Sequence, residues 1–156
     1  MTKKFNQYLG KAGQLAVMSE LLMRGWNVAI PEVDVGDDIF VVKDDDGTLR
    51  RVQVKTSMAT KRKHGFSVQF LIPRRQIQAE IDMYFVLIAR FENRWSDLVI
   101  IASGKLREHV DSYKKVSASG GDINLYLSYT KDQVICSKVD FTGYRNDFSY
   151  FPFIEH

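Results

Sequence analysis

The sequence has little of several features that would place it in a particular protein class. Its single cysteine, Cys136, cannot form an internal disulfide, so we expect a reducing compartment and a thiol buried in a strand. The three histidines lack the spacing of a metal triad, and no phosphate-binding glycine loop or nucleophile-elbow motif occurs. The longest apolar run, residues 83–89, is far below the roughly 20 residues of a membrane-spanning helix. These absences favour a cytoplasmic protein with no membrane contact and no small-molecule cofactor.

The composition that remains is that of a soluble globular domain. Of the 156 residues, 45% are hydrophobic and 26% are charged, which is close to the average for globular proteins. Domains most often have roughly 100–150 residues, and no repeat or flexible linker divides this chain. We therefore expect a single domain over residues 1–156. The net charge of +3 permits a nucleic-acid partner without requiring one.

Hydrophobic periodicity predicts both helices and strands along the chain. Helices are expected over residues 10–24, after Pro73, and over residues 104–115; strands are expected over residues 26–30, 38–43, 50–56, 66–72, 81–90, 98–102, 125–129 and 134–137. Asp46-Gly47 predicts a two-residue hairpin turn with positive φ at both positions. This order of elements predicts an α/β fold in which helices flank a mixed central β-sheet.

The two strands on either side of that turn carry the most informative side chains. Because residues alternate along a strand, Gln53 and Lys55 share one face and Val54 points to the other. The hairpin should bring Asp38, at the start of the first strand, close to Gln53 and Lys55 near the end of the second. An acid, an amide oxygen and an ammonium then meet at one end of the sheet. Magnesium prefers oxygen ligands, and an ammonium can orient a water or stabilise charge that develops on a phosphate.

These residues resemble the PD-(D/E)XK nuclease superfamily, in the variant where the Glu of the E-x-K motif is Gln. The resemblance rests on residues 38–40, the hairpin and Gln53-Val54-Lys55, and it extends over residues 10–57. Gly13-Gln14 and the acidic residues before the first strand are similar to bacterial domains of unknown function in that superfamily. A more distant similarity is to archaeal Holliday-junction resolvases. The resemblance implies a restriction-endonuclease-like fold with four or five strands and a helix on each side.

The resemblance also implies hydrolysis of DNA phosphodiester bonds with Mg²⁺ or Mn²⁺. Carried over residue by residue, it makes Asp38 the metal-binding acid and Lys55 the catalytic lysine. Gln53 and the backbone carbonyl of Val54 become further metal ligands. The family also uses a Glu from the first helix, and this chain has Gln14 at that position.

Two residues of the first helix compete for the place of that glutamate. At about 100° per residue, Gln14 points toward the sheet with the apolar stripe that contains Met18 and Leu21, whereas Glu20 points outward beside Arg24. We expect Gln14 at the site and Glu20 on the surface. With Gln14 and Gln53 neutral, a divalent cation should bind weakly. The site then needs substrate phosphates to complete the metal shell, has lost activity, or carries a Gln14 that was introduced in place of a natural Glu.

Two further groups of residues are candidates for binding a partner. The basic residues expected to contact nucleic acid are Lys61, Arg62, Lys63, Arg74 and Arg75. The aromatic residues of the C-terminal tail are Tyr144, Phe148, Tyr150, Phe151 and Phe153. For the basic group, the alternative is a pair of solvated loops. For the aromatic tail, docking on the parent domain is favoured over packing against a second subunit.

Three functions are compatible with these patterns. The favoured one is a magnesium-dependent endonuclease that acts on DNA, expected to form a homodimer so that both strands are cut. The second is a catalytically inactive nuclease-fold module that binds nucleic acid or a partner protein. In the third, Asp38 and Lys55 form an ion pair that is only structural.

Overall fold

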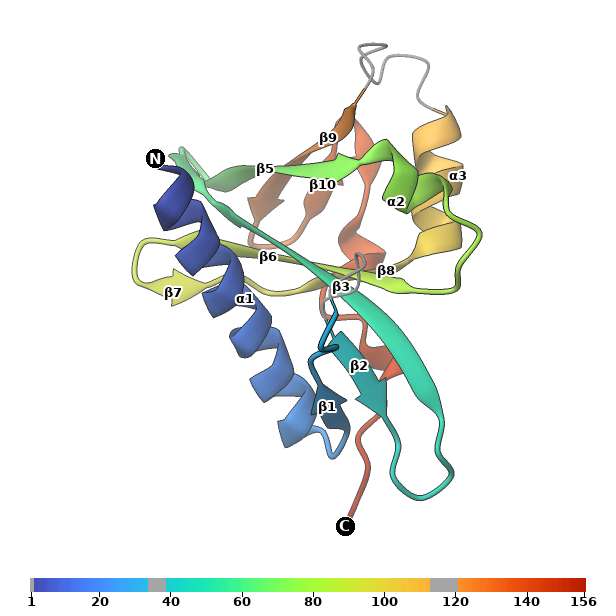
Figure 1. Cartoon of the computed structure of the whole chain (residues 1–156). Helices are drawn as coiled ribbons and strands as arrows, with labels where there is room; N and C mark the ends of the chain where they lie inside the picture. The colour runs from blue at the N-terminus through green and yellow to red at the C-terminus, as the bar shows by residue number, and fades with distance from the viewer. Residues whose placement is uncertain (1, 34–38, 113–120) are drawn as a thin grey trace.

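The computed structural model describes residues 2–33, 39–112 and 121–156, which form two β-sheets with helices packed against them (Figure 1). The first sheet consists of β1 (Asn27–Ala29), β2 (Ile39–Val42), β3 (Leu49–Met58), β6 (Tyr84–Phe91), β7 (Arg94–Trp95) and β8 (Val99–Ala102). The second sheet consists of β4 (Thr60–Arg62), β5 (Gly65–Pro73), β9 (Asp122–Thr130), β10 (Val134–Cys136) and β11 (Val139–Asp140). The helices are α1 (Lys3–Met23), α2 (Arg74–Gln78) and α3 (Ser103–Ser112), with short 3-10 turns η1 (Thr142–Tyr144) and η2 (Phe148–Tyr150). The expected α/β class is therefore confirmed.

The first sheet is mixed, as expected, but it has more strands than the resemblance implied. Its order is β1-β2-β3-β6-β7, and β8 also pairs with β6. β3 and β6 run parallel, from Val52↔Tyr84 to Met58↔Arg90, whereas their other neighbours are antiparallel. The expectation of four or five strands was wrong because the short strands β1 and β7 extend the sheet at its edges.

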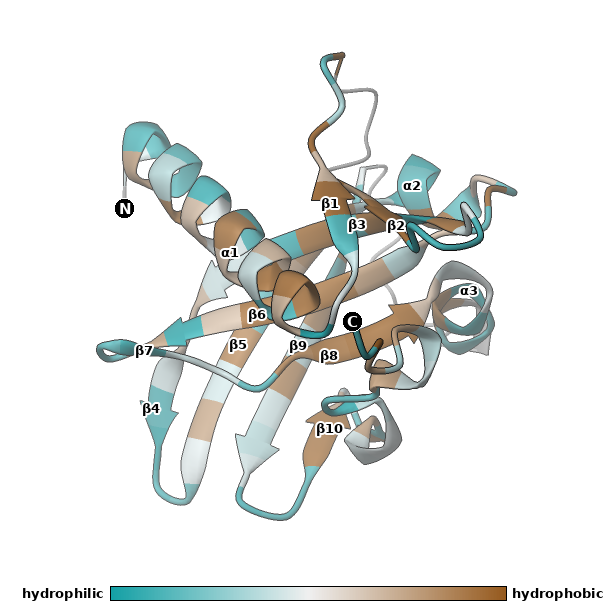
Figure 2. Cartoon of the chain, turned by 90° about the horizontal axis from the view of Figure 1, so that it is seen from below, coloured by the Kyte–Doolittle hydropathy of each residue, from teal (hydrophilic) through white to brown (hydrophobic). Residues whose placement is uncertain are grey.

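The two faces of the first sheet are covered by different layers. α1 lies on one face, where Val52 and Val54 share a buried cluster with Val17 of the helix. The second sheet and α3 cover the other face, where Leu87 of β6 shares a cluster with Phe70 of β5. β8 and β10, both hydrophobic along their length in Figure 2, contribute to this second core. The expected helix on each side is therefore present, with α1 on one face and α3 on the other, but a second sheet also contributes to the second layer.

α1 begins earlier than the hydrophobic pattern predicted. The Thr2 side chain caps it by accepting a hydrogen bond from the Phe5 amide at 3.1 Å, and the helix ends before Gly25, whose φ is +89°. Residues 2–8 are all exposed, so they carry no buried stripe that would reveal the first two turns. Leu15 and Leu22, although apolar, are exposed. No helix in the described ranges is long and apolar enough to cross a membrane.

The turn between β2 and β3 differs from the two-residue turn predicted. The Lys43 amide donates to the Thr48 carbonyl and the Gly47 amide donates to the Lys43 carbonyl, which makes a four-residue loop. Gly47 has positive φ and Asp46 does not. Asp46 instead accepts a hydrogen bond from the Thr48 amide through its side chain. The Asp46 carboxylate thus stabilises a four-residue loop. The preference of Asp-Gly for two-residue turns concerns backbone φ angles and does not take this side-chain hydrogen bond into account.

The C-terminal tail docks on its own domain, as the sequence analysis favoured. Phe151 is fully buried in the cluster beneath α1, and its ring meets that of Trp26 edge-on. The Trp26 indole donates to the Pro152 carbonyl at 2.9 Å, and the Ile154 amide donates to the Arg24 carbonyl at 2.8 Å. The tail therefore belongs to the core of the domain.

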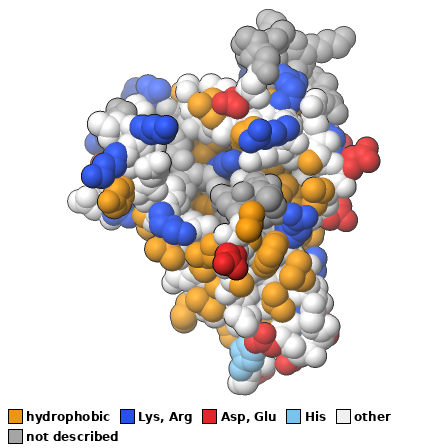
Figure 3. Space-filling view, in the orientation of Figure 1, with side chains coloured by type: hydrophobic (Ala, Val, Ile, Leu, Met, Phe, Trp, Pro, Cys, Tyr) orange, Lys and Arg blue, Asp and Glu red, His pale blue; other side chains and the backbone are white. Residues whose placement is uncertain are grey.

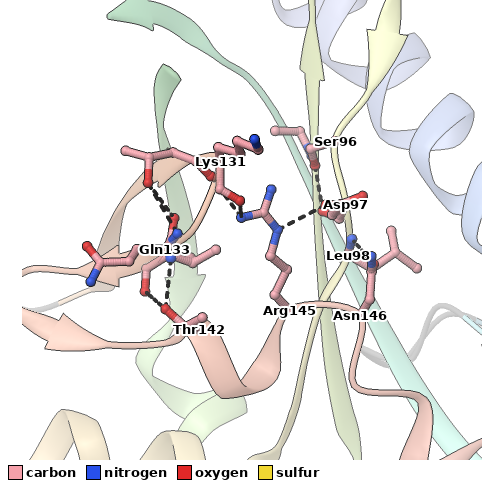
Figure 4. A network of polar contacts seen from close by, with 11 residues as sticks. Ser96, Asp97, Leu98, Lys131, Gln133, Thr142, Arg145 and Asn146 are labelled. Carbon is pink, nitrogen blue, oxygen red and sulfur yellow. Dashed lines mark hydrogen bonds and ion pairs between the residues drawn. The ribbon is translucent and has the colours of Figure 1, made fainter. Parts of the chain in front are cut away.

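A polar clasp joins the second sheet to the loop before β8 (Figure 4). Arg145 lies 2.9 Å from the Asp97 carboxylate and donates to the carbonyls of Thr130 and Lys131. Asn146 exchanges two hydrogen bonds with the backbone of Leu98. We refer to these contacts of Arg145 and Asn146 as the Arg145 clasp.

Candidate active site

The candidate site lies where β2 stops pairing with β3. Within the described residues, β2 pairs with β3 from Val42↔Leu49 to Ile39↔Val52. β3 continues for six residues beyond Val52, the partner of the first described residue of β2. Asp38, the residue before Ile39 in the sequence and the expected metal-binding acid, lies outside the described residues, as do Asp34 and Gly36 of the acidic lead-in.

Gln53 and Lys55 share one face of β3, as alternation along the strand predicted. Gln53 pairs with Phe85 and Lys55 pairs with Leu87, both of which pack in the core on the side of the second sheet. Val54 packs in the opposite core, beneath α1. The side chains of Gln53 and Lys55 therefore have the relative orientation that the sequence predicted, whereas the position of Asp38 relative to them lies outside the described residues.

Gln53 carries a buried oxygen whose hydrogen-bonding capacity is unused. Its side chain is 4% exposed, and Oε1 has no hydrogen-bond donor within the described ranges. A buried amide oxygen left in this state costs about 1–3 kcal/mol relative to a partnered one. Such an oxygen is therefore a candidate ligand for a group that binds at this end of β3.

α1 approaches β3 closely because of a glycine. A Cβ atom built on Gly13 would lie only 2.0 Å from Thr56 Oγ1, so the helix can approach the strand this closely only without a side chain at position 13. The next residue, Gln14, is 9% exposed, and its Oε1 accepts a hydrogen bond from Lys11 Nζ at 2.7 Å. Thr56 Oγ1 is buried and, like Gln53 Oε1, has no partner in the described part of the chain. The close contact thus places Gln14 beside the strand that carries Lys55.

Gln14 and Lys55 line one cavity of about 440 Å³ between α1, β3 and the segment after β1. Lys11, Val54 and Thr56 also line it, whereas Gln53 lies outside the lining. Figure 3 shows Lys and Arg side chains around a hollow on this face of the molecule. The structure therefore brings Gln14 and Lys55 to one cavity, with Gln53 buried next to Lys55 in the same strand.

Glu20, the competitor of Gln14, lies on the outer surface of α1. Its side chain is 47% exposed and pairs with Arg24 at 3.2 Å, one helical turn further on. The placement of Gln14 against the sheet and of Glu20 on the surface is thus confirmed. The helical wheel succeeded here because α1 is regular over this stretch.

The two basic clusters lie at opposite ends of β5. Arg62 ends β4, and Lys63 with His64 forms the loop to β5. Arg74 and Arg75 follow β5 as the first residues of α2. The ends of this nine-residue strand are roughly 26 Å apart at about 3.3 Å per residue. The clusters therefore form two separate basic regions.

Arg62 is held against the second sheet by side-chain hydrogen bonds to Ser67 and Tyr126. Its Nε donates to Ser67 Oγ at 2.8 Å, and its Nη2 donates to the Tyr126 hydroxyl at 3.3 Å. Hydrogen bonds from Ser67 and Arg62 lower the pKa of Tyr126. The guanidinium is thus pre-positioned on the outer face of the second sheet.

Other side chains offer no second catalytic centre in the described residues. That part of the chain contains no cluster of three or more His, Cys, Asp or Glu residues that could hold a metal. Cys136 is buried in β10, as expected, and burial raises the pKa of its thiol to about 11, which makes it a poor nucleophile. Sequence reasoning missed Lys11 and Thr56 of the cavity, and also its polar residues Asn6 and Gln7. The spacing of Lys11 and Gln14 by three residues on a helix was the available signal for Lys11.

Comparison with known proteins agrees with this geometry. The family model of PD-(D/E)XK endonucleases matches residues 5–83, just over half of the chain. Among solved structures, a bacterial homing endonuclease, I-Ssp6803I, is similar with a TM-score of 0.56 and 23% identity, over 92% of this chain and 88% of that one. At this identity the similarity is one of fold, and it confirms the restriction-endonuclease-like architecture. No curated protein matches the chain. The family match over residues 5–83 shows that this chain belongs to the PD-(D/E)XK endonuclease family.

Proposed function

We propose that this chain is a metal-dependent endonuclease that hydrolyses DNA phosphodiester bonds, with Lys55 as its catalytic lysine. One observation supports the proposal above all. Lys55 lines a cavity on β3, and it is the position that the resemblance to the family makes the catalytic lysine. An ammonium in that position can stabilise negative charge that develops on the phosphate or orient the attacking water.

The proposed metal ligands come from neighbouring positions on the two strands. Asp38 directly precedes Ile39, whose pairing partner Val52 directly precedes Gln53. We assign to Asp38 the role of metal-binding carboxylate, and to Gln53 and the backbone carbonyl of Val54 the role of further oxygen ligands. Gln14 is assigned to the same site from the side of α1.

The described residues fit a hard divalent cation such as Mg²⁺ or Mn²⁺. Such ions prefer oxygen ligands, and Gln53 Oε1 is a buried oxygen without a donor in the described ranges. When bound, the ion would neutralise charge on the phosphate and activate a water molecule. The cavity beside Lys55, of about 440 Å³, offers room for a phosphate group.

Cleavage of supercoiled plasmid DNA by the purified protein, with Mg²⁺ or Mn²⁺ and with a chelator, tests the proposal. Lys55→Ala should lower the cleavage rate by about 10²–10³-fold, the loss typical of removing one group that stabilises transition-state charge. Lys105→Ala is the matched control, because Lys105 is an exposed lysine on α3. Absence of metal-dependent cleavage by the wild type, or equal rates for the wild type and Lys55→Ala, would refute the assignment.

A second candidate function is a nuclease-fold module that binds nucleic acid or a partner protein without cutting. The contact between Lys11 Nζ and Gln14 Oε1 favours it, because an ammonium already engages the amide where the family motif has a carboxylate. This function predicts DNA affinity that falls with salt and survives Asp38→Ala. Metal-dependent turnover above the level of Lys55→Ala would exclude it.

We further propose that Lys61, Arg62, Lys63, Arg74 and Arg75 contact DNA phosphates. Their separation into two regions at the ends of β5 suits an extended duplex that spans both. Each phosphate contact that is removed should reduce the slope of log K against log salt by about 0.9. Measuring this slope for Lys63→Ala and Arg75→Ala, with Lys105→Ala as the control, distinguishes phosphate contacts from merely solvated side chains.

A further inference from the structure

The face of α1 that points away from the sheet carries an apolar stripe. Phe5, Tyr8, Leu15, Leu22 and Met23 are 45%, 66%, 52%, 53% and 75% exposed. Ala12 and Ser19 are exposed on the same side of the helix. Positions 5, 8, 12, 15, 19 and 22 are then separated by alternating steps of three and four residues, and Met23 adjoins the last of them. That spacing keeps side chains on one side of a helix and is typical of helices that pack against another helix. We call residues 5, 8, 12, 15, 19, 22 and 23 the outer stripe.

The outer stripe is separate from the surface that packs on the sheet. At about 100° per residue, it covers roughly 100° of the helix circumference, on the side opposite the buried residues Leu9, Gly13, Val17 and Leu21. Residues 3–8, at the start of α1, are all exposed, and this end of the helix extends away from the sheets in Figure 2. Short helical segments without tertiary packing are marginal in water. A continuous apolar stripe on such a segment is therefore unusual for a surface that stays exposed.

The order of residue sizes along the outer stripe suits an antiparallel copy of itself. The six residues from Phe5 to Leu22 are arranged symmetrically about the midpoint between positions 13 and 14. An antiparallel second copy would place Tyr8 opposite Ser19 and Leu15 opposite Ala12, so that large residues face small ones. A parallel copy would place Ala12 opposite Ala12 and Ser19 opposite Ser19, which leaves gaps.

The exposed area reaches what a specific dimer needs. A large side chain has an accessible area of about 200 Å² when it is fully exposed. Multiplied by the exposed fractions of the five large residues of the outer stripe, this gives roughly 600 Å² of exposed area per chain. Two chains would bury about 1,200 Å², the lower end of the range for specific interfaces. We propose that the outer stripe of α1 is the interface of a two-fold symmetric homodimer in which the α1 helices pack antiparallel.

Pairing through the outer stripe leaves the candidate site accessible. Gln14 is directed toward β3, and the cavity it shares with Lys55 opens between α1 and the strands. The dimer would therefore carry two sites, one on the inner side of each paired helix. The interface proposal does not depend on whether those sites cut DNA, because its test measures mass.

Analytical ultracentrifugation of the full chain from about 1 to 200 μM tests the interface. The wild type should sediment as a dimer that dissociates on dilution. Leu15→Glu should raise the dimer dissociation constant by about 30-fold or more, because a symmetric interface contains the change twice. Leu71→Glu is the control: Leu71 is 59% exposed on β5, far from α1 in the sequence, and the change should leave the constant within about twofold.

Cross-linking reports the orientation. In an antiparallel pair, Ala12→Cys of one chain should form a disulfide with Leu15→Cys of the other under mild oxidation in a mixture of the two variants. Each variant alone should cross-link poorly, whereas a parallel pair would give the reverse. The native Cys136 is 2% exposed and should not compete.

Three results would overturn the proposal. They are a monomeric wild type at 200 μM, a dimer that Leu15→Glu does not weaken, and cross-links within each variant alone. Binding of the monomer to anionic lipid vesicles through the same stripe would assign it to a membrane surface and would also overturn the dimer. Circular dichroism and melting curves confirm that Leu15→Glu and Leu71→Glu are folded before masses are compared.

Discussion

The Arg145 clasp and the candidate site at the end of β3 differ in how their polar groups are satisfied. In the clasp, the Arg145 guanidinium contacts a carboxylate and two carbonyls, and Asn146 uses both its backbone amide and its side-chain oxygen (Figure 4). At the candidate site, Gln53 Oε1 and Thr56 Oγ1 are buried without a partner in the described residues. The clasp therefore stabilises the fold, whereas the candidate site carries a cost that a bound ion or substrate could offset.

The largest effect on stability is expected from breaking the clasp. Arg145→Ala removes the donor to Thr130 and Lys131 and leaves Asp97 without its cation. The free energy of unfolding should fall by about 2–3 kcal/mol, and the melting temperature by about 5–10 °C for a domain of this size. Urea unfolding and calorimetry measure both.

The control for the clasp is an exposed ion pair. Lys105 and Glu108 are 3.5 Å apart, with side chains 58% and 71% exposed, and Lys105→Ala should cost less than about 0.5 kcal/mol. If Arg145→Ala costs no more than Lys105→Ala, the contacts of Arg145 are not a stabilising unit.

The next effect concerns the metal affinity of the candidate site. Gln14→Glu should tighten Mn²⁺ binding about tenfold, or about 1.4 kcal/mol, because a carboxylate is a stronger ligand than an amide. Isothermal titration calorimetry of the metal alone measures it. Gln69→Glu adds the same charge at an exposed position of β5 that does not line the cavity. An equal gain in that variant would show a general effect of charge and would remove residue 14 from the metal shell.

Removing the buried oxygens Gln53 Oε1 and Thr56 Oγ1, which have no partner in the described residues, should change the free energy of unfolding less than breaking the clasp does, and in the opposite direction. Gln53→Leu should raise the free energy of unfolding by about 1 kcal/mol, because it removes a buried acceptor that lacks a donor, while it weakens metal binding. Thr56→Val, a change of similar shape on the same strand, should also stabilise. Urea unfolding decides the matter: destabilisation by both changes would show that the two oxygens are satisfied in solution and that the contrast with the clasp is false.

The smallest effect is a pH dependence next to the clasp. Hydrogen bonds from Thr142 lower the pKa of Asp140 below its usual value of 3.8. This contribution to stability is present above pH 3.8 and is lost as pH falls through the pKa of the folded state. Compared with Asp140→Asn, the wild type should lose stability below pH 3.8, and the two unfolding curves should run parallel from pH 5 to 7. Parallel curves below pH 3.8 would contradict the assignment.

The candidate site was predictable from the sequence wherever local rules apply. The alternation that places Gln53 and Lys55 on one face depends only on strand geometry, and the direction of Gln14 depends only on helical periodicity. The pairing of β2 with β3 follows from two β-forming segments joined by a short loop. The assignment of Asp38 stays a prediction, because that residue lies outside the described ranges.

The rest was decided by packing between distant segments. The parallel pairing of β3 with β6 joins residues about 30 positions apart, and the second sheet joins β5 to β9 across more than 50. Contacts of this kind depend on how well two surfaces fit, which no local pattern encodes. The same holds for the close approach of Gly13 to Thr56 and for the burial of Phe151 beneath α1.

The sequence by itself thus determined which residues share a face, because the periods of helix and strand are set by local backbone geometry. Only the tertiary structure decided which faces meet. It brought Gln14 to the cavity with Lys55, left Gln53 Oε1 without a donor in the described residues, and left the outer stripe of α1 exposed. The physical reason is that burial and satisfaction of polar groups depend on neighbours that are remote in the chain.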